Sequence, residues 1–435
     1  MPAKRVLVVG TTSDYIEILS RRYPGRILFL TDHKERAGAF EPPPEAGSEV
    51  LCDLMHYDKT LTILRDFLIQ HNFELSGVAC FDDESMALTS FIAKTFSLPY
   101  PPASAVANGR SKFLSKQLWE EAGLPSPRMT LIHDLAEAIT FLGQISGPIV
   151  IKPLTGSGSE LTFACHSEDD CRKAFAQIRE KLEKHSNIRM YLADGRSSQP
   201  DPHTVFVGEE FIEGREFSAD FIVDGDKIKI IRIAGKIFSA NNSFGTALGY
   251  ILPMELPPAI NKDAFSNQLL EAAHALGVER SFVMIDFIVR DGKAIMLEMA
   301  PRPGGDNLPF LIRQSSDFDI LGATLDFAEG KQITIPGQEA WKRLIGARII
   351  AAREGTISEM DTAPALRDMR VRECYLKRHL GHKVILPPDD YDSRILGHVI
   401  FAPTDWSNVE SEIVELLEKV NIKQGQVSCL AIPTF

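Results

Sequence analysis

The sequence predicts a mixed α/β and α+β protein made of three consecutive regions, residues 1–105, 106–330 and 331–435. Three observations support this prediction. Apolar runs alternate with helical patterns in the first region, which is typical of a parallel sheet covered by helices on both faces. Strand-like runs joined by tight turns dominate the second region and indicate antiparallel hairpins. Shorter segments separated by glycine turns predict a smaller α+β region at the C-terminal end.

Composition limits the classes of function that the protein can have. A length of 435 residues is enough for two or three domains, and the formal net charge of −12 disfavours a non-specific binder of nucleic acid or of an anionic membrane. No apolar run approaches the roughly 20 residues that cross a bilayer, and the N-terminus enters a strand without an apolar leader. The six cysteines show no Cys-x-x-Cys spacing. We therefore expect a cytoplasmic protein without a disulfide framework or a zinc site.

The first region contains four predicted strands, and an acidic triplet follows the last of them. The strands are expected at residues 5–10, 26–31, 50–52 and 77–81. Gly10 does not begin a Gly-x-Gly-x-x-Gly sequence, so no dinucleotide site is predicted. Asp82, Asp83 and Glu84 follow a strand end, where α/β sheets bind ligands. They either face a substrate amine or serve as the N-cap and first-turn acids of a helix.

Two lysines in the second region are candidates for contact with a nucleotide. Residues 106–124 predict one amphipathic helix that ends at Gly123. Lys112 and Lys116 lie four residues apart and therefore share one face of this helix. That face is either a solvated surface or the place where a lysine reaches the phosphates of a nucleotide.

A loop rich in glycine and serine after Lys152 predicts a phosphate-binding site. A short buried strand at residues 147–152 ends with this lysine, and the loop that follows contains Ser157, Gly158 and Ser159. Such a loop presents several backbone N–H groups and hydroxyls to an anion and tolerates positive φ. It lacks the Gly-Lys-Ser/Thr ending of a P-loop.

Acidic residues on two further strands are candidates for contact with a nucleoside. Two predicted strands, expected to be antiparallel neighbours, carry Glu209 and Glu216. Their carboxylates could hold amino and hydroxyl groups of a nucleoside, and the backbone at Phe211 and Ile212 could read the edge of an adenine. The alternative is that both acids simply face solvent.

Two other segments complete the set of candidates. Residues 236–249 form a predicted loop rich in Asn, Ser and Gly, and loops of this kind often carry specificity. Asn241 and Ser243 are its candidate substrate contacts. In the C-terminal region, four basic side chains are interpreted as surface or packing residues rather than catalysts: Arg370, Arg372, His379 and His382.

The residues that best indicate a metal centre lie in a predicted hairpin. Two strand-like runs flank the turn Arg-Asp-Gly-Lys, and each contains one carboxylate that its apolar pattern does not explain, Asp286 and Glu298. Two carboxylates on one face of a hairpin suit Mg²⁺, which prefers oxygen ligands and shares them with substrate phosphates. Arg302 follows directly, and then Gly304 and Gly305, where a backbone can approach a ligand closely.

Taken in order, these signals resemble the ATP-grasp superfamily. The resemblance covers nearly the whole chain and implies a Rossmann-like N-terminal domain, a central ATP-grasp domain with a lid at about residues 126–205, and a C-terminal α+β cap. The matching motifs are Lys112 with the later Ala-Gly-Leu-Pro, Ile151-Lys152-Pro153 with its Gly/Ser loop, the run from Glu209 to Glu216, and Asp286 with the run from Leu297 to Gly305. Any one motif is weak, whereas all four in this order are fairly specific.

The resemblance implies a nucleotide-binding role for nine of these positions. Lys112 and Lys152, together with the Gly/Ser loop, would bind the phosphates of ATP. Glu209 and the backbone of Phe211-Ile212 would hold the adenine. Glu216 would bind the ribose.

The resemblance likewise implies the metal centre and the catalytic residues. Asp286 and Glu298 would hold Mg²⁺, with Mn²⁺ as a second option, and Arg302 would bind the transferred phosphoryl group or the substrate carboxylate. The family often has Asn at the position of Ala300, so the third metal ligand stays open. Either Glu298 bridges two ions or Asn307 substitutes.

The activity implied by the resemblance is that of an ATP-dependent carbon–nitrogen ligase. It would join an amino acid or small carboxylic acid to an amine through an acyl phosphate, with release of ADP and phosphate, and L-amino-acid ligases are the most similar members. We expect small-molecule substrates, no nucleic acid, no membrane, and a homodimer as one assembly. Two alternatives stay open. The first is an ATP-grasp carboxylase that uses bicarbonate and is similar to biotin carboxylase or to aminoimidazole-ribonucleotide carboxylase. The second is a nucleotide-binding protein without catalysis.

Overall fold

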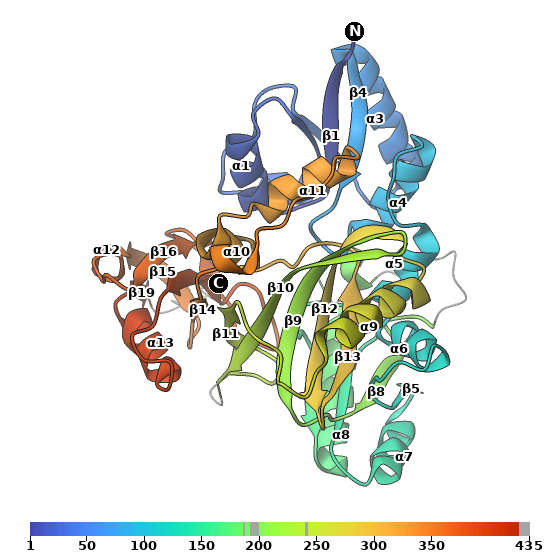
Figure 1. The fold of residues 1–435 in the computed structure, drawn as a ribbon, viewed down its shortest axis with the longest axis vertical. Coiled ribbons are helices and arrows are strands. Elements are labelled where there is room, and N and C mark those ends of the chain that lie inside the picture. Colours follow the sequence, from blue (N-terminus) through green and yellow to red (C-terminus); the bar gives the residue numbers. More distant parts are fainter. Residues whose placement is uncertain (186–187, 192–199, 240–241, 426–435) are drawn as a thin grey trace, which may run out of the picture.

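The N-terminal part of the chain is a parallel sheet with helices around it. The computed structural model describes residues 1–185, 188–191, 200–239 and 242–425, which form four sheets (Figure 1). The N-terminal sheet has the order β3-β2-β1-β4, and every neighbouring pair is parallel, as predicted. Its elements are β1 (Ala3–Val9), α1 (Ser13–Arg22), β2 (Ile27–Asp32), α2 (His33–Gly38), β3 (Glu49–Cys52), α3 (Tyr57–His71), β4 (Phe73–Ala79) and α4 (Met86–Thr95).

A helix from much later in the chain packs on this sheet. Leu321 and Leu325 of α11 (Ile320–Ala328) share a buried apolar cluster with Val6 and Val8 of β1. Figure 1 shows α11 crossing beside β1 and β4. Arg26 adds ion pairs to two acidic residues of the same segment, at 2.5 and 2.8 Å. The N-terminal sheet is therefore fixed to the central part of the molecule.

An eight-stranded antiparallel sheet forms the centre of the molecule. Its order is β13-β12-β9-β10-β11-β14-β18-β16, and every neighbouring pair is antiparallel. The strands are β9 (Arg215–Asp224), β10 (Lys227–Phe238), β11 (Ala247–Leu252), β12 (Arg280–Arg290), β13 (Lys293–Ala300), β14 (Leu344–Ile350), β16 (Val371–Leu376) and β18 (Ile395–Phe401). The last three lie beyond Gly330, so the C-terminal region continues the central sheet. The two predicted boundaries between the three regions stay predictions.

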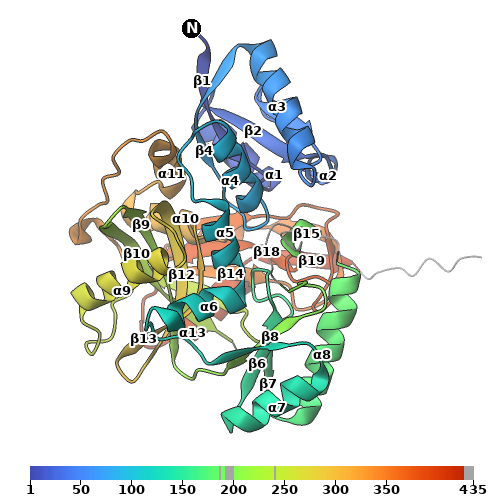
Figure 2. The ribbon, with the colours of Figure 1, turned by 90° about the vertical axis from the view of Figure 1, so that its right-hand side faces the viewer.

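A separate four-stranded sheet lies at the end of the molecule opposite the N-terminal sheet (Figure 2). Its order is β5-β8-β6-β7, and two helices accompany it. The elements are β5 (Met129–Ile132), α7 (Leu135–Ile145), β6 (Ile149–Pro153), β7 (Phe163–Cys165), α8 (Glu168–Glu183) and β8 (Phe206–Glu210). Cys165 and Cys171 in this part are both buried free thiols. We call this unit the lid.

The remaining elements connect these sheets or close the C-terminal region. Four helices lie around the central sheet: α5 (Ala103–Arg110), α6 (Lys112–Glu121), α9 (Lys262–Ala275) and α10 (Leu308–Ser316). A three-stranded sheet, β17-β15-β19, joins the C-terminal elements. These are β15 (Gly355–Asp361), α12 (Ala363–Leu366), β17 (Lys383–Val384), α13 (Val409–Glu418) and β19 (Asn421–Gly425), and the short 3₁₀ helices η1 and η2 span Ile188–Tyr191 and Gln338–Ala340.

Three predictions about these elements were wrong. The single helix expected over residues 106–124 is two helices, because Ser111 has extended backbone angles and its side chain accepts the N–H of Leu114 to begin α6. Glu209 and Glu216 are not on neighbouring strands, since β8 belongs to the lid sheet and β9 to the central sheet. The loop expected from residue 236 starts later, because Lys236 still belongs to β10.

Candidate active site

Four lysines from three parts of the chain meet four carboxylates between the lid and the central sheet. Lys112 is the first residue of α6, Lys116 lies one turn later, Lys152 is on β6 in the lid, and Lys236 is on β10. The acids in contact with them are Glu209, Glu216, Asp286 and Glu298. We call these eight residues the lysine–carboxylate cluster.

Glu209 is the centre of one half of this cluster. Its carboxylate lies 2.7 Å from Nζ of Lys116 and 2.8 Å from Nζ of Lys152, and its side chain is only 3% exposed. Burial lowers the pKa of Lys116 to about 8 although Glu209 opposes this effect, whereas the pKa of Lys152 is raised because Glu209 and Glu298 outweigh its burial. Lys116 is fully buried, so its face of the helix is not a solvated surface. Glu209 thus fixes the position of two lysines, and its contact with adenine stays a prediction.

The other half of the cluster is the hairpin of β12 and β13. Asp286 and Glu298 are directly opposite each other, because the strand register shifts by one residue between Asp286 and Phe287. Lys236 donates to Oδ2 of Asp286 at 2.6 Å and also to Glu216. Burial would raise the pKa of Glu298, but the nearby lysines outweigh burial and lower it, so this carboxylate is charged. Nζ of Lys112 lies 3.8 Å from Oε2 of Glu298 and joins the two halves of the cluster.

The donor set of this hairpin fits a Mg²⁺ ion that shares its ligands with phosphates. Oδ1 of Asp286 is buried and has no hydrogen-bond partner, which leaves a hard oxygen available opposite Glu298. No group of three or more metal-binding side chains occurs among the residues that the structure describes. Ala300 provides no oxygen, and the amide of Asn307 instead donates to the carbonyl of Gly346 at 3.0 Å. The remaining ligands would have to be phosphate or water oxygens.

Arg302 connects the hairpin to the N-terminal sheet. It donates to both oxygens of Asp83, at 2.9 and 2.6 Å, in the bidentate geometry of a strong ion pair. Burial would raise the pKa of Asp83, but Arg302, Arg110 and Lys112 lower it. The acidic triplet after β4 therefore faces the site through Asp83. The pKa of Asp82 is raised well above its usual value by burial and by Glu84.

The Gly/Ser loop lies over the lysines. Nζ of Lys112 donates to the carbonyl of Gly156 at 2.6 Å. Gly156, Gly158 and Ser159 all have positive φ, at 115°, 65° and 59°, and Ser157 accepts the N–H of Glu160 through its carbonyl. The Ser159 hydroxyl donates to the carbonyl of Gly245 at 2.9 Å, which joins the loop to the segment between β10 and β11. The loop thus lies where phosphate binding is predicted.

Several other predicted contacts have different surroundings. The backbone N–H of Phe211 donates to the carbonyl of Pro148 at 3.1 Å, so this donor is already used within the lid. Ile212 is buried with Ile288. Contact of this pair of residues with an adenine edge stays a prediction. The N–H of Phe211 is not available for it.

The predicted substrate contacts divide between the two loops. The N–H of Gly304 donates to Oδ1 of Asp220 at 2.7 Å, and Gly305 follows it beside Arg302. The hydroxyl of Ser243 accepts a hydrogen bond from Arg394 at 2.8 Å. Asn241 lies outside the described residues.

The sequence analysis does not assign a site role to three residues that the structure places in the site: Lys116, Lys236 and Asp83. Lys116 was seen on the correct helix face, but only the buried ion pair with Glu209 shows its role. Asp83 was noted at a strand end without a partner. Lys236 reaches the site only through the strand register of the folded sheet, which the sequence alone does not reveal.

Comparison with known proteins shows which domain and which proteins the chain is similar to. Residues 145–309 match the family model of the ATP-grasp domain. The uncharacterized protein y4rH of Sinorhizobium fredii is 25% identical over 358 residues, which cover 80% of this chain and 68% of that protein. A D-alanine–D-alanine ligase of Acidovorax ebreus is 25% identical over 360 residues, which cover 77% and 95% of the two chains. The crystal structure of an L-amino acid ligase from Bacillus licheniformis matches with a TM-score of 0.75 and 18% identity, and covers 98% and 100% of the two chains.

The chain therefore contains a region that matches the ATP-grasp domain, residues 145–309, and the predicted fold is confirmed. Its class is that of the ATP-dependent ligases. None of the helices in the described part of the chain has the length and apolar character of a membrane span.

Proposed function

We propose that this protein is an ATP-dependent carboxylate–amine ligase that forms an amide bond between amino acids or small carboxylic acids. The observation that carries the proposal is the lysine–carboxylate cluster, in which lysines from the lid, from α6 and from the central sheet surround the Asp286–Glu298 pair. Such a cluster suits a triphosphate, whose oxygens need several positive charges and a metal ion.

In the first step, an oxygen of the substrate carboxylate attacks the γ-phosphorus of ATP. The bond from this phosphorus to the β–γ bridging oxygen breaks, ADP leaves, and an acyl phosphate forms. Lys112 and Lys152 offset the negative charge on the transferred group, and Arg302 holds the acyl phosphate next to the N-terminal sheet. Asp286 and Glu298 would hold Mg²⁺, which when bound neutralises phosphate charge.

In the second step, the substrate amine attacks the acyl carbon. The bond from this carbon to the phosphate oxygen breaks, inorganic phosphate leaves with the electron pair, and an amide forms. The amine must be deprotonated to attack, and the new amide nitrogen loses a further proton. The departing phosphate is itself a base and accepts one of these protons, and solvent accepts the other.

The lid protects the intermediate from water. The Gly/Ser loop bonds to Lys112 on one side and to Gly245 on the other, so it covers the cluster. An acyl phosphate hydrolyses readily in water, and exclusion of solvent favours transfer to the amine.

A phosphate-release screen tests the proposal. The purified protein is incubated with Mg²⁺ and ATP, with pairs drawn from amino acids and small dicarboxylic acids, and amide products are identified by mass spectrometry. We expect phosphate release that requires both members of a pair. Dependence on bicarbonate alone would instead make the protein a carboxylase. ATP binding without ADP release under any condition would leave a nucleotide-binding protein without catalysis.

A further inference from the structure

A buried arginine without an acidic partner lies beside the predicted specificity loop. Arg394 precedes β18 and is only 7% exposed. Its Nη2 donates to the hydroxyls of Ser243 and Thr246, at 2.8 and 2.9 Å, and its Nε is buried without a hydrogen-bond partner. No carboxylate among the described residues forms an ion pair with it. A buried guanidinium without a counter-ion is costly, so this arrangement requires an explanation.

The two hydroxyls extend this positive site. Since each accepts a hydrogen bond from Arg394, each must direct its own proton elsewhere. The oxygens of Ser243 and Thr246 lie 3.0 Å apart, and one O–H can bond to the other hydroxyl. The second O–H then stays available. A guanidinium with an adjacent free hydroxyl donor is a suitable site for a carboxylate.

A second guanidinium lies close to the first. Arg348 bonds to Asp306 at 2.6 Å and to the Tyr250 hydroxyl at 3.2 Å. The pKa of Arg394 is lowered by burial and by the charge of Arg348, while only Tyr391 opposes these effects. Asp306 pairs with Arg348 alone, so the second arginine brings no carboxylate to Arg394.

Strand register relates the neighbouring Arg348 to the lysine–carboxylate cluster. Lys236 on β10 is opposite Tyr250 on β11, and Tyr250 is opposite Gly346 on β14. Arg348 is two residues beyond Gly346 and therefore points to the same face of the sheet. Two strand spacings separate β10 from β14, which is roughly 10 Å. A substrate of amino-acid size can bridge part of this distance.

We propose that Arg394, with Ser243 and Thr246, binds the carboxylate of the amine substrate, the carboxylate that the reaction leaves intact. This inference rests on the proposed function and specifies its second substrate as an amino acid rather than a simple amine. The carboxylate that is activated must instead lie next to the γ-phosphate, beside Lys152 and Glu298. Two separate anion sites let the enzyme distinguish these two carboxylates.

A binding experiment tests the site without turnover. Saturation-transfer NMR is recorded with a mixture of L-amino acids and with a mixture of the corresponding amino-acid amides, in the presence of MgADP. We expect signals from the amino acids, not from the amides, and loss of these signals in Arg394→Gln. Arg353→Gln is the matched control, because Arg353 is exposed in the same region. An absence of amino-acid signals in the wild-type protein, or equal signals in wild type and Arg394→Gln, would overturn the inference.

Kinetics with the ligase pairs found in the screen provide the second measurement. In Arg394→Gln, KM for the amine substrate should rise roughly tenfold or more, as for loss of a charged hydrogen bond, while KM for ATP is unchanged. Arg394→Lys should recover only part of the effect, because lysine lacks the planar fork of donors. Amide formation with an unchanged amine KM would refute the arginine site and keep the ligase. Amino-acid signals that depend on Arg394 without any amide product would keep the site and refute the ligase.

Discussion

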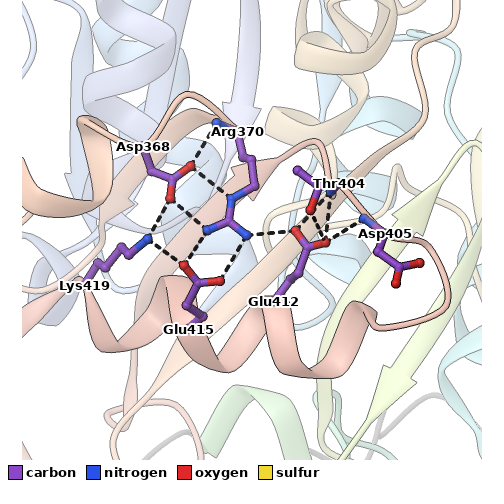
Figure 3. Close-up of polar contacts among 7 residues, drawn as sticks. All are labelled: Asp368, Arg370, Thr404, Asp405, Glu412, Glu415 and Lys419. Atoms are coloured by element: carbon purple, nitrogen blue, oxygen red, sulfur yellow. Dashed lines mark hydrogen bonds and ion pairs between the residues drawn. The ribbon is translucent and has the colours of Figure 1, made fainter.

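Two charged networks in this protein contain similar residues but differ in how completely their polar atoms are paired. In the C-terminal region, Arg370 bonds to Asp368, Glu412 and Glu415, at 2.8, 2.9 and 2.7 Å (Figure 3). Lys419 completes this C-terminal network through two of the same acids. In the lysine–carboxylate cluster, by contrast, one buried oxygen of Asp286 has no hydrogen-bond partner.

This difference separates a structural network from a binding site. The C-terminal network joins the start of β16 to α13 and leaves no buried side-chain polar atom unpaired among its described members. Such a network stabilises the fold and has no free group for a ligand. The lysine–carboxylate cluster holds four buried or nearly buried cations from separate elements, and its unpaired oxygen is a cost that a bound ion would remove. We expect substitutions in the cluster to affect activity and those in the network to affect stability.

The largest expected effect is loss of turnover after truncation in the cluster. Lys152→Ala and Glu298→Ala should each lower the rate of phosphate release by at least about 100-fold, since each removes a charge next to the transferred group. The native fold should persist, because Glu209 keeps Lys116 as a partner. Thermal unfolding of each variant is the control for folding. Rates within a few-fold of wild type would remove these residues from the catalytic site.

Affinity for ATP should weaken as the pH rises above about 8. The pKa of Lys116 is about 8 because the residue is buried, so its positive charge is present at pH 7 and mostly lost at pH 9. The charged fraction falls by roughly tenfold over this range, and the Kd for ATP should increase by a similar factor. Titration calorimetry at several pH values measures this change. Lys116→Met should bind ATP more weakly, and its Kd should not change with pH. A Kd of the wild-type protein that does not change with pH would contradict the place of Lys116 in the nucleotide site.

The C-terminal network should give the opposite pattern. Arg370→Gln leaves three acids with fewer donors, and the free energy of unfolding should fall by about 1–3 kcal/mol. The kcat and the KM for ATP should remain within about twofold of wild type. Urea unfolding and the phosphate-release assay on the same preparation measure both quantities. A large loss of activity with unchanged stability would contradict the contrast between the two regions.

Acid should remove the contribution of Glu412 to stability. This carboxylate accepts hydrogen bonds from Thr404, Asp405 and Arg370, which outweigh its burial and lower its pKa to about 2. Because the native pKa is lowered, the stabilisation is present above pH 4.5 and is lost as the pH falls toward 2. The stability difference between wild type and Glu412→Gln should therefore shrink from pH 5 to pH 2. A difference that is constant over this range would show that ionisation of Glu412 is not its source.

The smallest expected effect concerns an ion pair between the lid and the C-terminal region. Lys181 on α8 lies 2.6 Å from Asp389, whose side chain is 61% exposed. Exposed ion pairs contribute little, so Lys181→Gln should leave the midpoint of urea unfolding close to that of wild type and change kcat by no more than about twofold. A tenfold fall in kcat would show that this contact controls closure of the lid.

The parts of the site that depend on local sequence were predictable, and those that depend on long-range pairing were not. The Asp-Gly turn predicts the hairpin that contains Asp286 and Glu298. Regular pairing from this turn would place Asp286 opposite Leu297, and the register shift beside Phe287 that pairs it with Glu298 was not predictable. Lys236 reaches Asp286 only through the register of β10 within an eight-stranded sheet. Asp83 meets Arg302 across more than half of the chain. No local pattern contains either of these contacts.

The fold shows the same division. Alternation of strands and helices identified the parallel N-terminal sheet, because each element leaves its own periodicity in the sequence. Continuation of the central sheet into β14, β18 and β16 could not be deduced, since antiparallel neighbours are chosen by packing between distant segments. The break at Ser111 was missed for another reason: the amphipathic pattern continues through a residue whose side chain begins a new helix.

The most direct test of the central claim is calorimetric titration of the protein with ATP in the presence and absence of Mg²⁺. The account predicts one ATP site per chain and tighter binding of ATP when Mg²⁺ is present. Glu298→Gln should remove the effect of Mg²⁺, and Lys152→Ala should abolish binding of ATP. Binding of ATP that is unaffected by these substitutions would contradict the claim that the lysine–carboxylate cluster is the nucleotide site.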